Sequence, residues 1–194
     1  MYNLGRMTEY LAENLPRDVE PPDLILTTGS ADETQRIGET LGALLLPGDL
    51  VLLHGPLGAG KTTFTQGVAR GMGLLSRVTS PSFTLANVYE PNGHGFSLNH
   101  LDLWRIKSPE EALGIGLDEY LSENAGCIVE WPDVAAPVFP GEQLRIRFTA
   151  NSDARELTFR AAGRRPTQLL EALRGALHAM SPNTVPAGAR APGN

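Results

Sequence analysis

Eight consecutive residues in the first third of the chain constrain its fold more than any other feature of the sequence. Residues 55–62 read Gly-Pro-Leu-Gly-Ala-Gly-Lys-Thr, and this G-x-x-x-x-G-K-T spacing is the pattern of a phosphate-binding loop. A short apolar run at 49–54 precedes the loop, and a run with apolar residues at helical spacing follows it at 62–72. A strand, a glycine-rich loop and a helix in this order are the context that the pattern requires. The alternative is a glycine-rich turn that binds no ligand, but such a turn would seldom have both a strand before it and a helix after it.

The chemistry of such a loop follows from its backbone. Gly58 and Gly60 can take backbone angles that are closed to residues with a β-carbon, so the chain can approach a ligand closely. The loop amides then form an anion-binding nest, to which the following helix adds its free amides and the positive end of its dipole. We expect Lys61 to bring a positive charge to the β- and γ-phosphates of ATP, and the Thr62 hydroxyl to bind Mg²⁺. The loop residues expected to contact the nucleotide are Pro56, Leu57, Gly58, Ala59, Gly60, Lys61, Thr62 and Thr63.

Composition narrows the classes of function. The chain has 194 residues, of which 41% are hydrophobic, and this is enough for one globular domain. Its formal net charge of −6 argues against tight autonomous binding to nucleic acid, which needs a basic face. The single cysteine, Cys127, rules out an internal disulfide and fits a cytoplasmic protein. The most apolar stretch, 41–53, is interrupted by Pro47-Gly48-Asp49, so we expect no membrane span there.

The two ends of the chain differ from its middle. Residues 1–22 are polar and contain three prolines, which predicts a flexible N-terminal extension. Residues 181–194 are rich in proline, alanine and glycine, which predicts a disordered tail. Between them we expect a P-loop ATPase domain at 23–163 and an amphipathic C-terminal helix at 164–180.

Helical and strand patterns are mixed throughout the middle of the chain. Capping patterns mark helix starts at Ser30 and Ser108, and the first of these helices is expected to run to Pro47. Strands are expected at 24–27, 49–54, 82–90, 96–104, 127–130, 144–149 and 156–160. This mixture predicts a three-layer α/β fold of the P-loop NTPase type, with a mainly parallel sheet and added antiparallel hairpins. Ligands on such sheets bind beyond the carboxyl ends of the strands.

A phosphate-loop enzyme also needs a carboxylate near Mg²⁺, usually at the end of a neighbouring strand. Asp102 and Glu130 each follow a strand-like run, and either is a candidate for catalysis and for the metal, with a purely structural carboxylate as the alternative. The segment 79–84 contributes Ser80, Ser82 and Thr84, whose hydroxyls either reach the metal or the γ-phosphate or serve only as turn residues. The residues alone do not decide which carboxylate contacts the metal.

Several short strings, taken in order, point to a known family. They are Gly58-Ala59-Gly60-Lys61-Thr62-Thr63-Phe64, Ser80-Pro81-Ser82-Phe83-Thr84-Leu85, His100-Leu101-Asp102-Leu103-Trp104-Arg105, Pro109-Glu110-Glu111, Gly116-Leu117-Asp118-Glu119-Tyr120 and Val129-Glu130-Trp131-Pro132. In this order and spacing they closely resemble the TsaE (YjeE) family, over roughly residues 24–148. Ser82 stands where threonine is common in the family, and Trp104 where tyrosine is common.

The resemblance implies a slow, Mg²⁺-dependent ATPase of tRNA threonylcarbamoyladenosine synthesis. Such proteins act through partners of the TsaD and TsaB type, which modify adenosine 37 of tRNAs reading ANN codons, so tRNA contact would be indirect. The resemblance gives Asp102 the Walker B-like place, Glu130 the metal-site carboxylate and 80–84 the switch-like loop. It places Trp131 beside the site and the stretch 30–34 near the base, and we expect Trp131 and Thr84 to contact the nucleotide. The cofactors implied are ATP and Mg²⁺.

Three other functions share parts of this pattern. A small-molecule kinase would need an arginine-bearing lid, but the arginines between 130 and 167 fall in a predicted strand pair. A GTP-dependent switch would need an Asn-Lys-x-Asp motif, which the sequence lacks. A non-catalytic nucleotide-binding subunit is disfavoured because Lys61, Thr62, Asp102 and Glu130 are all present.

Overall fold

The computed structural model describes residues 23–76, 78–82, 84–91, 93–151 and 154–180. The extension predicted at 1–22 and the tail predicted at 181–194 lie outside this range. Within it, no helix has the length and apolar character needed to cross a membrane.

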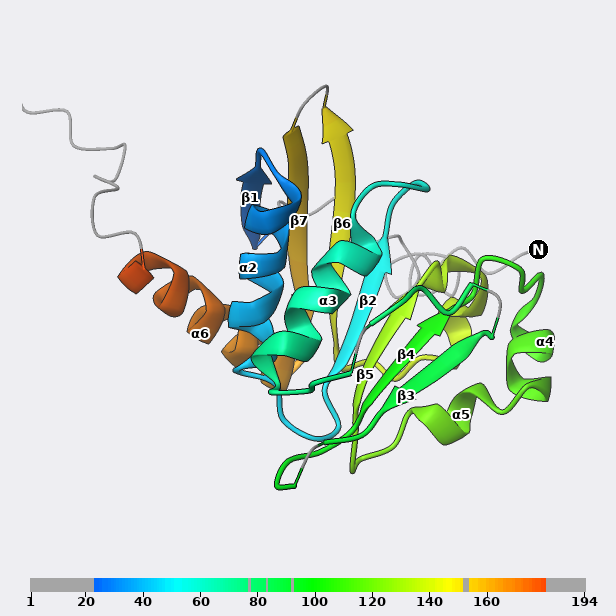
Figure 1. The fold of residues 1–194 in the computed structure, drawn as a ribbon. Coiled ribbons are helices and arrows are strands. Elements are labelled where there is room, and N and C mark those ends of the chain that lie inside the picture. Colours follow the sequence, from blue (N-terminus) through cyan, green and yellow to red (C-terminus); the bar gives the residue numbers. More distant parts are fainter. Residues whose placement is uncertain (1–22, 77, 83, 92, 152–153, 181–194) are drawn as a thin grey trace, which may run out of the picture.

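The described residues form one mixed sheet between helices (Figure 1). Its seven strands are arranged in the order β1-β7-β6-β2-β5-β4-β3. Their bounds are Leu24–Thr28 for β1, Leu50–His54 for β2, Ala86–Tyr89 for β3, Leu98–Asp102 for β4, Gly126–Glu130 for β5, Gln143–Asn151 for β6 and Ala154–Ala162 for β7. The predicted α/β class is therefore confirmed.

The sheet is less parallel than the sequence suggested. Strand β2 pairs in parallel with β5 and β6, and β4 with β5, whereas the pairs β1–β7, β6–β7 and β3–β4 are antiparallel. Half of the pairings are thus antiparallel, because two hairpins and β1 surround a parallel centre. The parallel centre brings the carboxyl ends of β2, β4 and β5 to one edge.

Helices cover both faces of the sheet. They are α2 (Ala31–Gly42), α3 (Lys61–Gly71), α4 (Pro109–Gly114), α5 (Leu117–Tyr120) and α6 (Arg164–Met180), with a 3-10 segment, η2 (Pro132–Val138). Helices α2, α3 and α6 pack on one face, and α4, α5 and η2 on the other, so the molecule has three layers.

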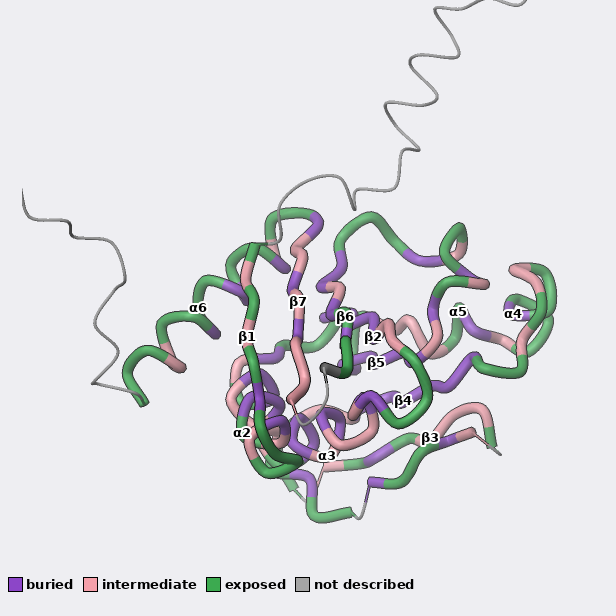
Figure 2. Tube along the Cα trace, turned by 90° about the horizontal axis from the view of Figure 1, so that it is seen from above, coloured by how far each residue is buried: buried purple, intermediate pink, exposed green. Residues whose placement is uncertain are grey.

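Alternation along β2 explains the two cores. Val51 and Leu53 are buried with α2 and α3, whereas Leu50 and Leu52 are buried with η2 and β5. Figure 2 shows burial concentrated on the central strands and on the inner sides of α2 and α3. Cys127 lies within β5, where burial raises the pKa of its thiol to about 12. This cysteine is a small apolar filler, not a reactive thiol.

Helices α2 and α3 pack backbone against backbone. A β-carbon at Gly42 would lie 2.1 Å from the Val68 carbonyl oxygen, and one at Gly71 would lie 2.0 Å from the Glu39 carbonyl oxygen. Gly38 and Gly67 make equivalent close approaches. Only glycine permits this separation, so α3, which follows the phosphate loop, is held directly against α2.

Three elements are shorter in the structure than predicted. The first helix ends at Gly42 instead of reaching Pro47, because the Leu44 and Leu45 amides bond back to the Leu41 and Gly42 carbonyls, three residues earlier. The strand expected at 82–90 is reduced to β3, since Leu85 has a left-handed backbone (φ 70°) and its amide bonds back to the Pro81 carbonyl. The strand expected at 96–104 covers only 98–102.

Candidate functional site

The loop at 55–60 connects the end of β2 to the start of α3. Gly58 and Gly60 have φ values of 75° and 104°, in the left-handed region that favours glycine. The Phe64 amide donates to the Gly60 carbonyl at 2.9 Å and so begins the helix. Ala59 is buried, while Leu57 is almost fully exposed. The loop therefore presents its backbone, not a wall of side chains, at the helix N-terminus.

Lys61 is buried at the centre of the site. Its Nζ donates to the carbonyls of Gly55 at 2.8 Å and Pro56 at 3.1 Å, and lies 3.9 Å from the centre of the Trp131 ring. Burial lowers the pKa of Lys61 below its ordinary value of 10.5, and the negative charges of Glu130 and Asp102 oppose this shift. The ammonium is therefore close enough to both candidate carboxylates to interact with their charges.

Glu130 connects the loop helix to the sheet. Its Oε1 accepts from Thr62 Oγ1 at 2.9 Å and lies 3.0 Å from His100 Nε2. His100 is buried and its Nδ1 has no partner among the described residues, so its visible contact is with Glu130. His100 is a positioning residue for this carboxylate. His100 lies two residues before Asp102, so the two side chains are on the same face of β4.

Asp102 lies beside Glu130, because β4 and β5 are paired with these two residues in register. Its Oδ2 accepts from Ser82 Oγ and, at 3.3 Å, from Ser80 Oγ, and its Oδ1 accepts from the Trp104 amide at 3.0 Å. The segment 80–82 is thus attached to this carboxylate through hydroxyl groups. The structure brings Ser80 and Ser82 to Asp102.

Thr84, for which nucleotide contact is predicted, forms hydrogen bonds within its own turn. Its hydroxyl donates to Asn87 Oδ1 at 3.0 Å and lies 3.5 Å from the Pro81 carbonyl. The next residue, Leu85, has a left-handed backbone, and its carbonyl accepts a hydrogen bond from the Asp102 amide at 2.9 Å. The Thr84 hydroxyl therefore braces the turn at 81–87 and is not brought to Asp102.

Trp131 closes the site on the side of the sheet edge. It has a left-handed backbone (φ 58°), an uncommon conformation for a bulky residue that costs about 1–3 kcal/mol. The turn places its ring over Lys61 and 4.4 Å from the ring centre of Trp104. Strain of this kind immediately after Glu130 is consistent with a functional constraint.

A cavity of about 290 Å³ opens beside the loop. It is lined by Thr28, Gly29, Ser30, Ala31, Thr34, Gly58, Gly60, Thr63 and Arg155. The stretch 30–34 and the phosphate loop therefore meet in one hollow, with room for part of a nucleoside. Thr28 and Arg155 were missed by sequence reasoning, because an arginine in a strand pair carries no local signal of a binding site.

The oxygen donors at the site suit Mg²⁺. Thr62 Oγ1 and Glu130 Oε1 are in contact, and Asp102 adjoins Glu130 in the sheet. In the described part of the chain, no group of three or more His, Cys, Asp or Glu side chains is arranged to hold a metal ion. Mg²⁺ needs no such cage, because it commonly uses one or two carboxylates together with substrate phosphates and water.

Comparison with known proteins decides the family. The model of the family described as "Threonylcarbamoyl adenosine biosynthesis protein TsaE" matches residues 28–157. The chain belongs to the TsaE family. A TsaE protein of Bacillus subtilis is 42% identical over 147 residues, which cover 75% of this chain and 90% of that protein. One from Treponema pallidum is 39% identical over 131 residues, covering 66% and 94%.

A solved structure has a similar fold. The crystal structure of Bacillus subtilis YdiB matches with a TM-score of 0.68 at 38% identity, over 79% of this chain and 95% of that one. Both the Bacillus and the Treponema proteins are named tRNA threonylcarbamoyladenosine biosynthesis proteins. The resemblance drawn from the short sequence strings is therefore confirmed, and the matched region contains the loop and both carboxylates.

Proposed function

We propose that this TsaE family member binds Mg-ATP at the loop 55–62 and hydrolyses it slowly, in support of threonylcarbamoyl modification of tRNA. The observation that carries the proposal is the contact between Thr62 Oγ1 and Glu130 Oε1 at 2.9 Å, beside the buried Lys61. A P-loop NTPase fold places its metal between these same two groups: the hydroxyl after the loop lysine and a strand-end carboxylate.

Each residue has a defined role in the proposal. The loop amides and Lys61 bind the β- and γ-phosphates, and Thr62 with Glu130 or Asp102 holds Mg²⁺, directly or through water. Mg²⁺, when bound, neutralises charge that develops on the phosphates. Glu130 and Asp102 also accept hydrogen bonds from the water molecule that attacks the γ-phosphate, and so orient it. The Trp131 ring shields Lys61 from bulk water. It also holds the Lys61 ammonium in place over its own face.

The substrate class and partners come from the family. Because the relatives carry the name of a tRNA threonylcarbamoyladenosine biosynthesis protein, we place this chain in the same process, acting at adenosine 37 of tRNAs that read ANN codons. We propose partner proteins of the TsaD and TsaB type as the site of group transfer, with tRNA contacted indirectly. The net charge of −6 supports a protein that acts through partners.

A small-molecule kinase is the alternative, and the fold gives it little support. Four of the described arginines after Glu130 lie on strands β6 and β7, and the other three lie on α6, which packs against α2, β6 and β7. Arg155, which lines the cavity beside the loop, comes from strand β7 and not from a helical lid. Phosphate transfer requires such positive charge close to the transferred group.

Two measurements test the proposal. Isothermal calorimetry with Mg-ATP should detect binding to the full chain, and phosphate release should rise when TsaD- and TsaB-type partners are added. In cells depleted of their own TsaE, the wild-type chain should restore threonylcarbamoyladenosine in bulk tRNA, measured by mass spectrometry of nucleosides, whereas Thr62→Ala should not. Absence of Mg-ATP binding would disprove the nucleotide role. If the wild type and the Thr62→Ala variant restored the modification equally, nucleotide binding would not be needed for tRNA modification.

A further inference from the structure

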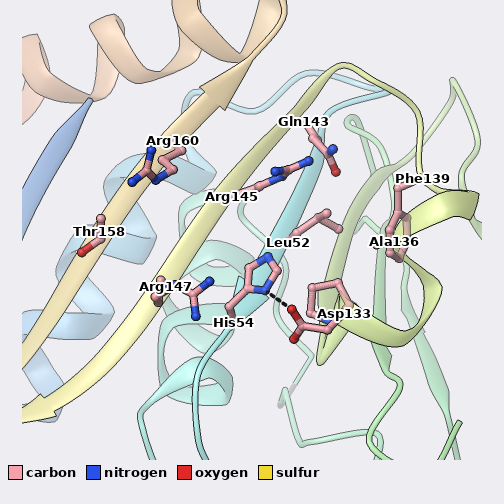
Figure 3. A pocket seen from close by; sticks show the side chains of 11 residues that line it. Leu52, His54, Asp133, Ala136, Phe139, Gln143, Arg145, Arg147, Thr158 and Arg160 are labelled. Atoms are coloured by element: carbon pink, nitrogen blue, oxygen red, sulfur yellow. Dashed lines mark hydrogen bonds and ion pairs between the residues drawn. The ribbon is translucent and has the colours of Figure 1, made fainter. Parts of the chain in front are cut away.

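A second cavity lies on the sheet face opposite α2 and α3. Its volume is about 590 Å³, within the range of small-ligand sites. Its walls come from β2, β6, β7 and η2, and Figure 3 shows their side chains projecting toward a common space. The polar groups that matter are His54, Asp133, Gln143, Arg145, Arg147 and Arg160. None of them belongs to the nucleotide site described above.

Positive charge is concentrated here in an otherwise acidic protein. Arg145 on β6 is directly opposite Arg160 on β7, and Arg147 lies two residues further along the same face of β6. Like charges directly opposite each other destabilise a sheet. Asp133 is the carboxylate among the described lining residues, and its Oδ1 lies 3.1 Å from His54 Nδ1. Among the described lining residues, cationic side chains therefore outnumber carboxylates.

Two buried polar atoms in the same cavity lack partners. Gln143 is only 5% exposed, and neither its Oε1 nor the His54 Nε2 has a hydrogen-bond partner in the described part of the chain. A buried polar atom left unpaired costs about 1–3 kcal/mol. Both residues line the cavity, so a small rotation of either side chain would bring its unpaired atom to a bound molecule.

We propose that this cavity is a binding site for a small organic anion, one that carries a carboxylate or phosphate together with a hydrogen-bond donor. Arg145, Arg147 and Arg160 bind the anionic group, and Gln143 Oε1 accepts from the donor. A guanidinium group has five N–H donors, so each arginine can bind the anion alongside its existing contacts. The cavity is separate from the loop, so the proposed anion binding does not depend on ATP hydrolysis by the chain.

Nucleic acid is a poorer fit than a small anion. Proteins that bind single strands present exposed aromatic rings on which bases stack. Among the residues that line this cavity, the Phe139 ring is buried at 8% exposure and belongs to the hydrophobic core. The cavity thus offers charge and hydrogen bonds without a stacking surface.

The test uses the full chain and three probes: O-phospho-L-serine, L-glutamate and a uridine oligoribonucleotide. Binding is followed by calorimetry and by the NMR signals of the His54 ring. We expect phosphoserine or glutamate to bind with a Kd at or below about 1 mM and to shift the His54 signals. The tighter of the two identifies phosphate or carboxylate as the recognised group.

Variants assign the binding to these side chains. Arg145→Gln and, independently, Arg160→Gln should each weaken binding about tenfold, the effect of losing one charge-assisted hydrogen bond. Arg36→Gln is the matched control, since Arg36 is exposed on α2, on the sheet face opposite the cavity. This variant should bind the probes with the affinity of the wild type. Thermal unfolding verifies that each variant is folded. No binding of either small probe, unchanged affinity in both folded cavity variants, or tighter binding of the RNA would each overturn the proposal.

Discussion

The parallel and antiparallel halves of this sheet carry their polar side chains in different places. In β4 and β5 the acidic residues are the last of each strand, Asp102 and Glu130, and they meet at the edge that adjoins the loop. In β6 and β7 the basic residues lie along the strand faces, where α4 and α5 do not cover the sheet. A strand end gives access to loop amides and a helix N-terminus, whereas an open strand face gives a broad surface. This difference underlies our two proposals, a triphosphate at the strand ends and a small anion on the strand faces.

The largest expected effect is at the loop lysine. Lys61→Ala removes the ammonium that interacts with the charges of both carboxylates, and we expect hydrolysis of Mg-ATP to fall about 10²–10³-fold, the loss typical of one preorganised charged donor. Phosphate release under saturating Mg-ATP measures it. Lys107→Ala, at an exposed position, is the control and should retain wild-type turnover. A Lys61 variant with wild-type turnover would remove the parallel half from the chemistry.

Glu130→Gln should have the next largest effect. The amide keeps the shape of the side chain but loses the negative charge, so we expect Mg²⁺-dependent turnover to drop about 10²-fold while the fold is retained. Turnover titrated against Mg²⁺ concentration measures the loss, and Glu171→Gln on α6 is the matched control. If turnover and its Mg²⁺ dependence were unchanged, Asp102 alone would have to supply the carboxylate.

The helices that cover the two halves should tolerate substitution differently. A β-carbon at Gly71 of α3 would lie 2.0 Å from a backbone oxygen, so Gly71→Ala should lower the free energy of unfolding by about 1–3 kcal/mol or more. Gly175 of α6 has nothing within 4 Å of such a carbon, so Gly175→Ala should raise it by about 0.5–1 kcal/mol. Urea denaturation of both variants measures the difference. Equal effects would mean that α2 and α3 are not in backbone contact.

The smallest effect concerns acid sensitivity at His54, the last residue of β2, which faces the arginines of β6. Burial, assisted by the charges of Arg147 and Arg145, lowers the pKa of His54 below 6.5 although Asp133 opposes the shift. The unfolded chain then binds more protons than the folded chain in the window just below pH 6.5, so stability falls as the pH decreases through it. His54→Gln should reduce this loss. Urea denaturation between about pH 7 and pH 5 checks it, and an unchanged slope would show that His54 is not responsible.

Sequence reasoning was effective where function depends on neighbours in the chain. The loop at 55–62 is contiguous, and Asp102 and Glu130 each follow an apolar run, so their places at strand ends could be inferred without a structure. The contact of His100 with Glu130 depends on the pairing of β4 with β5, and the pairing of Arg145 with Arg160 depends on hairpin register. Such non-local relations leave no local pattern. The short strand β3 was overestimated because nothing in the sequence marks Leu85 as left-handed.

The glycine contacts between α2 and α3 have a consequence for motion. Carbonyl oxygens of each helix occupy the space where a side chain would begin on the other, so neither helix can slide along its partner without a backbone collision. The pair should move as one rigid body when nucleotide enters or leaves. Conformational change then falls to segments attached by side-chain hydroxyls, above all Ser80 and Ser82 on Asp102. If the chain binds nucleotide as proposed, we expect this segment to be the part that responds to it.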